Sequence, residues 1–99
     1  MFYCYVLQSI KDRKTYVGYT HEIKQRLIKH NSGCVKATKN RRPLKLLFFE
    51  QFDVKKEAKK REVWWKSGAG RRKLKEYFKI NENNLAQSKT ANTRKKILG

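Results

Sequence analysis

The amino-acid sequence predicts a small α+β domain, because strand patterns and helix patterns both occur in a chain of only 99 residues. Three segments are dense in aromatic and β-branched residues, which favour strands. Two others repeat apolar residues at the spacing of a helix. A chain of this length buries a little over ~60% of the surface of its unfolded form, so we expect one core and no second domain.

The first two strands are expected at Phe2 to Gln8 and at Thr15 to Tyr19, where aromatic and β-branched residues are concentrated. The polar segment from Ser9 to Lys14 predicts a turn between them. Strands joined by so short a connection favour an antiparallel hairpin. Such a hairpin would bring Tyr5 and Tyr16 into the same region.

A helix of about three turns is expected next. Thr20 offers an N-cap hydroxyl, and Asn31-Ser32-Gly33 ends the pattern. The apolar residues at helical spacing are Ile23, Leu27 and Ile28. Arg26 and His30 lie four residues apart, so they share one face of this helix and can both point into a cleft.

The segment after this helix predicts a loop and then a buried strand. Cys34 to Arg42 lacks an apolar period and precedes Pro43, which favours an exposed loop. Leu44 to Phe52 is a nearly continuous apolar run and the strongest strand pattern in the chain. Such a run is typical of a central strand or of one covered on both faces.

Two helices are expected after the third strand. Asp53 can cap the first of them. Its apolar stripe consists of Val54, Ala58 and Trp65. A turn rich in lysine and arginine, from Ser67 to Lys73, would lead to a short last helix. That helix would hold Leu74, Tyr77 and Phe78.

From Lys79 onward the composition changes, because Asn and Lys dominate and large apolar residues become scarce. Such a segment buries too little apolar surface to fold alone. We therefore expect a domain over residues 1–78 and a basic, disordered tail over residues 79–99.

The charge of the chain predicts a polyanionic partner. Lys and Arg number 26 against 8 Asp and Glu, a formal net charge of +18. Nucleic acid is favoured over a membrane surface, because the basic residues form no amphipathic helix with a broad apolar face. The sequence also lacks the ~20-residue apolar run of a membrane span and the pattern of a signal peptide, so a cytoplasmic location is expected.

The two cysteines, Cys4 and Cys34, form no CxxC pair and belong to no His/Cys cluster at zinc spacing. Neither a thiolate metal site nor a disulfide framework is therefore indicated. Cys4 lies in an apolar strand pattern, so we expect it to pack in the core.

Five residues match the chemical needs of phosphodiester hydrolysis and are the candidate site: Tyr5, Tyr16, Arg26, His30 and Glu62. This reaction needs an activated water, positive charge near the phosphoryl oxygens and help for the departing oxygen. The guanidinium of Arg26 can neutralise phosphoryl charge. A single carboxylate, Glu62, can hold Mg²⁺, which keeps several of its waters. A tyrosine can orient or deprotonate the water, with Tyr16 as first choice and Tyr5 as second.

The spacing of these residues resembles a known family. The resemblance rests on Tyr3-Cys4-Tyr5, Tyr16-Val17-Gly18, Arg26, His30 and the later Glu62. This set is similar to the GIY-YIG nuclease superfamily, and most of all to its small stand-alone bacterial branch. That branch includes YhbQ-like proteins and is similar to the N-terminal nuclease domain of the UvrC excision-repair enzyme. Each triplet alone is a weak signal, whereas the combination is specific.

The resemblance implies a three-stranded antiparallel sheet flanked by helices. It also implies Mg²⁺ or Mn²⁺ held by Glu62 and waters, and a Gly18 that permits close approach at the end of a strand. The residues implied to line the cleft are Tyr5, Tyr16, Arg26 and His30.

The chain departs from the family pattern in three places, one of which is Val17 in place of the Ile of the second triplet. Tyr3 and Cys4 replace the Gly and Ile of the first triplet. Leu74 and Lys75 stand where some members have an Asn.

These residues also have structural alternatives. His30 would be favoured near a helix C-terminus by the helix dipole, whether or not it takes part in catalysis. Arg26 could be an ordinary solvated charge, and Glu62 could form an ordinary helical ion pair. Of the two tryptophans, Trp65 is expected to pack in the core, while Trp64 could pack or stack on bases.

Phosphate contacts are expected from basic residues in the loop and in the later turn: Lys36, Lys39, Arg41, Arg42, Arg71, Arg72 and Lys73. Phosphate contacts give affinity without sequence information. The leading hypothesis is therefore a Mg²⁺-dependent DNA endonuclease of structural or weak sequence selectivity, with RNA not excluded and with targeting left to the substrate or a protein partner. The alternatives are a noncatalytic basic nucleic-acid-binding module and a ribosome- or RNA-associated protein.

Overall fold

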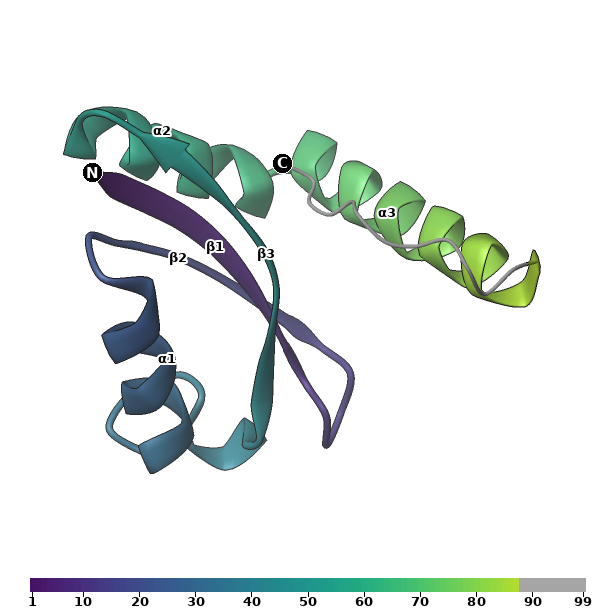
Figure 1. Cartoon of the computed structure of the whole chain (residues 1–99), viewed down its shortest axis with the longest axis horizontal. Coiled ribbons are helices and arrows are strands. Elements are labelled where there is room, and N and C mark those ends of the chain that lie inside the picture. The colour runs from purple at the N-terminus through teal and green to yellow at the C-terminus, as the bar shows by residue number, and fades with distance from the viewer. Residues whose placement is uncertain (88–99) are drawn as a thin grey trace.

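A computed structural model of the chain describes residues 1–87. Its strands are β1 (Phe2–Ser9), β2 (Thr15–Thr20) and β3 (Leu44–Phe52). Its helices are α1 (Ile23–Ser32), α2 (Lys55–Lys66) and α3 (Gly68–Gln87), with a short 3₁₀ turn, η1, at Lys39–Arg41. The three strands form one antiparallel sheet flanked by helices (Figure 1), which confirms the predicted α+β fold.

The sheet has the order β2-β1-β3, so β1 pairs with a strand on each side. Tyr5 pairs with Gly18 of β2 and with Phe49 of β3, which confirms the predicted hairpin. The prediction that Leu44 to Phe52 forms a central or two-sided buried strand is wrong. β3 lies at an edge, and its Phe49 is 43% exposed. The central place falls to β1 because the hairpin takes one of its edges and β3 the other.

Residues of β1 alternate between two apolar clusters, as the pleat of a strand requires. Cys4 and Val6 pack with residues of α2 and α3, in a cluster completed by Val17, Phe48, Trp65 and Leu74. Tyr5 and Leu7 belong to a second cluster, which contains Leu44 and is covered by Ile23 and Leu27 of α1. Cys4 is 1% exposed, so its predicted place in the core is confirmed.

Both predicted side-chain caps are wrong. Thr20 is the last residue of β2, because it pairs with Tyr3, and α1 begins only at Ile23 with Glu22 as N-cap. The Thr20 hydroxyl instead accepts the backbone N–H of Glu22 at 3.1 Å. At α2 the N-cap is Val54 rather than Asp53, and neither N-cap residue forms a side-chain cap bond.

The predicted turn from Ser67 to Lys73 is helical. Only Ser67 separates α2 from α3, and its hydroxyl accepts the backbone N–H of Gly70 at 3.3 Å, as N-cap hydroxyls do. A Cβ on Gly70 would overlap backbone atoms of Trp64 and Trp65. Glycine at this position therefore allows the start of α3 to lie against the backbone at the end of α2.

Helix α3 is also longer than expected, because it runs through residue 78, where the domain was predicted to end, and continues to Gln87. Figure 1 shows it extending away from the sheet. The domain boundary stays a prediction, since residues 88–99 of the proposed tail lie outside the described residues.

The segment from Cys34 to Arg42 is largely exposed, as predicted, but it is not a simple loop. It contains η1 and the fully buried Thr38. No helix within residues 1–87 is long and apolar enough to cross a membrane.

An ion pair fastens α2 to β3. Arg61 donates from Nε and Nη2 to the two carboxylate oxygens of Glu50, at 2.8 and 3.0 Å. The indole N–H of Trp65 donates to the same carboxylate at 2.8 Å. The Arg61 guanidinium also lies 4.3 Å from the ring centroid of Trp64, a cation–π distance. Trp65 is therefore a core residue, as predicted, and Trp64 packs beneath a cation.

Gly70→Ala is expected to lower the free energy of unfolding by about 1–3 kcal/mol, because the new methyl group meets backbone that cannot turn aside. Gly68→Ala is the matched control. A Cβ there meets only Arg72 Nη1, at 3.6 Å, and alanine is the better helix former. Urea denaturation of both variants measures the difference, and equal stabilities would contradict the packing argument.

Candidate active site

The buried hydroxyl of Tyr5 joins the sheet to α1. Tyr5 Oη lies 2.9 Å from His30 Nε2, and Arg26 Nε donates to the same oxygen at 3.3 Å. Tyr5 is 2% exposed and His30 is fully buried. The helical spacing of Arg26 and His30 therefore does place both side chains on one face, and that face meets β1.

His30 uses both ring nitrogens inside the protein. Nδ1 lies 2.8 Å from the hydroxyl of Thr38, which is itself fully buried. Sequence reasoning missed Thr38, because a threonine in a basic, aperiodic segment gives no signal of burial. Tyr5, His30 and Thr38 thus form a hydrogen-bonded chain across three segments, which we call the buried triad.

This geometry separates the two alternatives for His30. Its side chain caps no helix carbonyl, since its partners are hydroxyls of β1 and of the loop before η1. A fully buried ring also cannot touch a substrate in this structure. The hydrogen bonds of the His30 ring are therefore with Tyr5 and Thr38 inside the protein.

Burial sets the charge states of the site. Burial, aided by the Arg26 cation, lowers the pKa of His30 to about 4. Burial raises the pKa of Tyr5, with Tyr16 and Glu62 adding to the effect and Arg26 opposing it. The hydrogen bond to Tyr5 raises the pKa of Arg26. At neutral pH the site thus holds a neutral imidazole, a protonated Tyr5 and a cationic Arg26.

Gly18 makes room for the two tyrosine rings. A Cβ on Gly18 would lie 2.6 Å from Tyr5 Oη and 3.1 Å from Tyr16 Cε1. Side chains on neighbouring strands at this register would otherwise compete for the same space. The family resemblance implied that another group comes close to Gly18, and in the structure that group is the ring of Tyr5.

Tyr16 and Arg26 form the partly exposed part of the site. The Tyr16 ring lies 5.0 Å from the ring of His30 and 6.4 Å from that of Tyr5, between centroids. Its hydroxyl also interacts with Arg26. Of the two candidate tyrosines, only Tyr16 is therefore placed where a bound molecule could reach it.

Glu62 comes from α2. Its side chain is 17% exposed, and Oε2 accepts a hydrogen bond from Lys66 Nζ at 2.9 Å. The helical ion pair considered as an alternative is thus present, but Lys66 is 52% exposed and such pairs are weak. The carboxylate is also near enough to Tyr5 to raise its pKa. The charge of Glu62 therefore reaches the buried triad.

The donor set suits a hard cation better than zinc. Within residues 1–87 no group of three or more His, Cys, Asp or Glu side chains is arranged to hold a metal. In the same part of the chain no hydrogen bond occupies Glu62 Oε1. One open carboxylate oxygen fits Mg²⁺ or Mn²⁺, which accept few protein ligands and retain waters, whereas zinc takes three or four.

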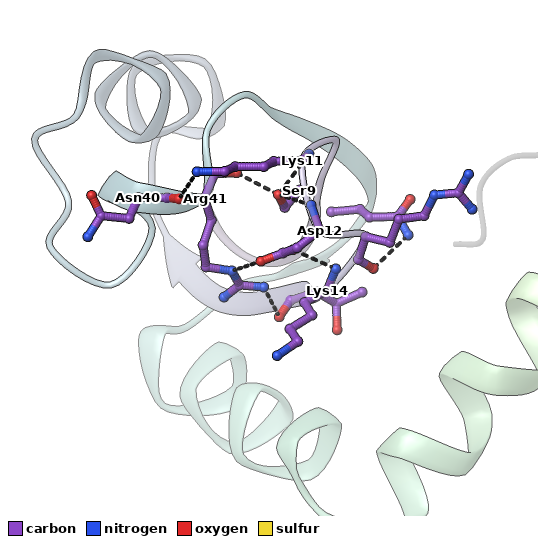
Figure 2. Close-up of polar contacts among 9 residues, drawn as sticks. Ser9, Lys11, Asp12, Lys14, Asn40 and Arg41 are labelled. Carbon is purple, nitrogen blue, oxygen red and sulfur yellow. Dashed lines mark hydrogen bonds and ion pairs between the residues drawn. The ribbon is translucent and has the colours of Figure 1, made fainter.

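The predicted phosphate-binding residues divide into two kinds. Arg41 is turned inward, with Nη2 donating to Thr15 O at 3.2 Å and Nε 3.5 Å from the Asp12 carboxylate (Figure 2). Its Nε is buried without a hydrogen-bond partner, so the contact with Asp12 is purely electrostatic. The exposed residues are Lys36, Lys39 and Arg42 near η1 and Arg71, Arg72 and Lys73 on α3.

The model of the GIY-YIG catalytic domain matches residues 1–75 of the chain. The chain belongs to this family. The match covers all three strands, α1 and α2, and therefore every residue of the candidate site, and it places the chain in a family of nucleases. Leu74, which stands near the position of an Asn in some members, is 6% exposed and packs in the core.

Relatives of this GIY-YIG domain occur in several bacteria. The chain is 46% identical to a UPF0213 protein of Staphylococcus saprophyticus over 74 residues, which are 74% of this chain and 89% of that one. It is 41% identical to a UPF0213 protein of Clostridium perfringens over 75 residues, or 75% and 80% of the two chains. A solution NMR structure of a UPF0213 protein from Bacillus halodurans is similar at 34% identity and a TM-score of 0.47, over 78% of this chain and 85% of that one.

Thr38→Val is expected to lower the free energy of unfolding by about 1–3 kcal/mol, because it leaves a buried ring nitrogen of His30 without its partner. Thr38→Ser keeps the hydroxyl and is expected to lose less than half as much. Urea denaturation at neutral pH checks the order, and a valine variant as stable as the serine variant would show that the hydrogen bond is dispensable.

The stability of the domain is expected to fall as the pH is lowered from about 6.5 to 4. The pKa of His30 is depressed in the folded state, so the unfolded chain binds more protons in this window and unfolding free energy rises with pH. The loss amounts to up to about 3 kcal/mol. Denaturation across this range, compared with His30→Asn, measures it. The exposed His21→Asn is the control, which should keep the slope that His30→Asn loses.

Proposed function

We propose that this chain is a divalent-metal-dependent endonuclease that hydrolyses DNA phosphodiester bonds with structural or weak sequence selectivity. The observation that carries the proposal is the joining of Tyr16 and Arg26, both partly exposed, to the buried triad of a GIY-YIG domain. The carboxylate of Glu62 acts on the same triad.

Arg26 binds the scissile phosphate. Its Nε is committed to Tyr5, which leaves the Nη donors of the fork for phosphoryl oxygens. Because the hydrogen bond to Tyr5 raises the pKa of Arg26, the cation persists at every working pH. It neutralises the charge that grows on the phosphoryl group in the transition state.

Tyr16 orients the attacking water. Its phenol oxygen is the only tyrosine oxygen of the candidate site on a partly exposed side chain, and it is held by contacts with the rings of Tyr5 and His30. Water oxygen bonds to phosphorus while the bond from phosphorus to the departing oxygen breaks. The water gives up one proton and the departing oxygen gains one, so the reaction is balanced.

Glu62 would hold the metal through its open carboxylate oxygen, with Lys66 moving aside or staying on the other oxygen. When bound, Mg²⁺ or Mn²⁺ supplies positive charge to the phosphate and lowers the pKa of coordinated water. Tyr5 and His30 touch neither metal nor substrate in this scheme. They hold the side chains of Arg26 and Tyr16 in fixed positions relative to each other, which preorganises the site.

Substrate choice follows from surface charge rather than from base reading. The exposed basic residues lie near η1 and at the start of α3, and we propose that they bind phosphates rather than read bases. We propose that the shape of the DNA or a protein partner provides the targeting.

Glu62→Gln is expected to lower the rate of metal-dependent cleavage by 100-fold or more, because it removes the anionic ligand. This change corresponds to ~3 kcal/mol of activation free energy. Glu57→Gln, the same change at an exposed residue of α2, should cleave like the wild type. The assay uses labelled duplex, flap, branched and single-stranded DNA with Mg²⁺, Mn²⁺ or EDTA.

DNA binding by Glu62→Gln, measured in the same buffers, should persist. Tight binding without cleavage by the wild type, with every metal and substrate, would contradict the nuclease proposal and favour a noncatalytic binding module.

A further inference from the structure

A basic pocket lies at the end of the sheet where β1 turns into β2. It has a volume of about 430 Å³ and is lined by Lys11, Asn31, Lys39, Asn40, Arg42 and Pro43. The three charged residues of this lining are cations, and the remaining polar residues are two amides. We call it the hairpin-end pocket. An anion entering it would meet positive charge from two separate loops and no carboxylate of the lining.

The two loops that form the pocket are bonded to each other. The hydroxyl of Ser9 accepts the backbone N–H groups of Lys11 and Asp12, each at 3.1 Å, and donates to the carbonyl of Arg41 at 2.6 Å (Figure 2). The backbone N–H of Ile10 donates to the carbonyl of Pro43 at 2.9 Å. Ser9 is fully buried, so these bonds are shielded from water. The hairpin turn and the η1 segment therefore form one rigid frame.

The third wall of the pocket is fastened in the same way. Asn31, at the end of α1, donates to Leu44 O at 2.9 Å and accepts from Leu44 N at 2.7 Å. This pair of bonds holds α1 against the start of β3. Asn31 is thus a scaffold of the pocket, and its lining cations carry the charge.

The cations are held in place but keep free donors. Lys11 Nζ donates to Asn40 O at 3.3 Å, and Arg42 Nε donates to Lys39 O at 2.9 Å. Each bond uses one donor, which leaves two ammonium hydrogens and the four Nη hydrogens of the guanidinium. The side chain of Lys39 bonds to no other residue within the described part of the chain. Prearranged donors of this kind suit the oxygens of a phosphate.

We propose that the hairpin-end pocket binds a backbone phosphate of the nucleic acid, at a point away from the bond that is cut. This proposal rests on the proposed nuclease function and adds a second contact to it. Ser9 lies ~13 Å along β1 from Tyr5, at ~3.3 Å per residue. Each strand of B-DNA carries a phosphate every 3.4 Å of axis. The pocket and the candidate active site are therefore far enough apart to contact different phosphates of one strand.

Salt dependence of DNA binding tests the pocket directly. Lys39→Gln removes one charge from the pocket without breaking a side-chain contact of the described residues. Lys60→Gln, at an exposed residue of α2, is the control, because it makes the same charge change away from the pocket. Fluorescence anisotropy of a short labelled duplex, in EDTA, gives Kd at a series of salt concentrations. The slope of log Kd against log salt should fall in Lys39→Gln, and it should fall by up to about 0.9, the whole contribution of one phosphate contact, in Lys11→Gln/Lys39→Gln.

Equal slopes for Lys39→Gln and Lys60→Gln would overturn the proposal. Arg42→Gln, checked by its thermal midpoint because Arg42 also bonds Lys39, should reduce the slope as Lys39→Gln does. Titration with inorganic phosphate, followed by amide NMR shifts of Asn40 and Lys39, separates the two sources of phosphate. Shifts with inorganic phosphate but none with duplex would show a site for free anions and would also overturn the proposal.

Failure of the nuclease proposal gives a different result. If the wild type does not cut DNA while the pocket variants still lower the salt slope, the pocket stands as a nucleic-acid contact. If Glu62→Gln abolishes cutting while the pocket variants behave like Lys60→Gln, the nuclease stands without the pocket.

Discussion

The hydrogen bond from Tyr5 to His30 determines how the sheet and α1 meet. A phenol hydroxyl and an imidazole buried together must satisfy each other, since an unpaired polar group in the interior costs ~1–3 kcal/mol. Gly18 leaves the space for the Tyr5 ring, and Thr38 takes the remaining nitrogen of His30. These contacts fix the Tyr5 oxygen at the place where Arg26 donates to it, beside Tyr16. The exposed chemistry of the site therefore depends on a buried, electrically neutral chain of hydrogen bonds.

The carboxylate of the site is positioned by a separate set of contacts on the other face of the sheet. Glu50 of β3 binds Arg61 and Trp65, and these two residues flank Glu62 in α2 at distances of one and three positions. A helix fastened at both points cannot rotate freely about its axis. This explains why an arginine, rather than an apolar residue, lies next to the tryptophan core: it pairs with a half-buried carboxylate. Glu62, the proposed metal ligand, is thus held in place by contacts of its neighbours Arg61 and Trp65 with Glu50.

The basic residues of this protein are of two kinds, those paired inside the fold and those exposed to solvent. Arg41 forms contacts inside the fold, with the carboxylate of Asp12 and with a backbone carbonyl. Arg61 forms an ion pair with Glu50. Other cations stay exposed on α2, on α3 and on the two loops that Ser9 joins by hydrogen bonds. A high net charge alone predicts attraction to a polyanion. The division between structural and free cations determines where that polyanion can be held.

The sequence by itself determined the class of fold, the strands, the family and the identity of the five candidate residues, because each leaves a local pattern of spacing or composition. It could not reveal that β1 is the central strand, since strand order depends on pairing between distant segments. It missed Thr38, and it placed Arg41 on the surface, because burial of a polar residue is decided by a partner that the sequence does not name. The helix starts at Ile23 and Gly68 were also misjudged, because pairing and packing overrode local capping preferences. Only the tertiary structure divided the five residues into a buried pair, Tyr5 and His30, and a partly exposed set, since solvent exposure is a property of the packed chain.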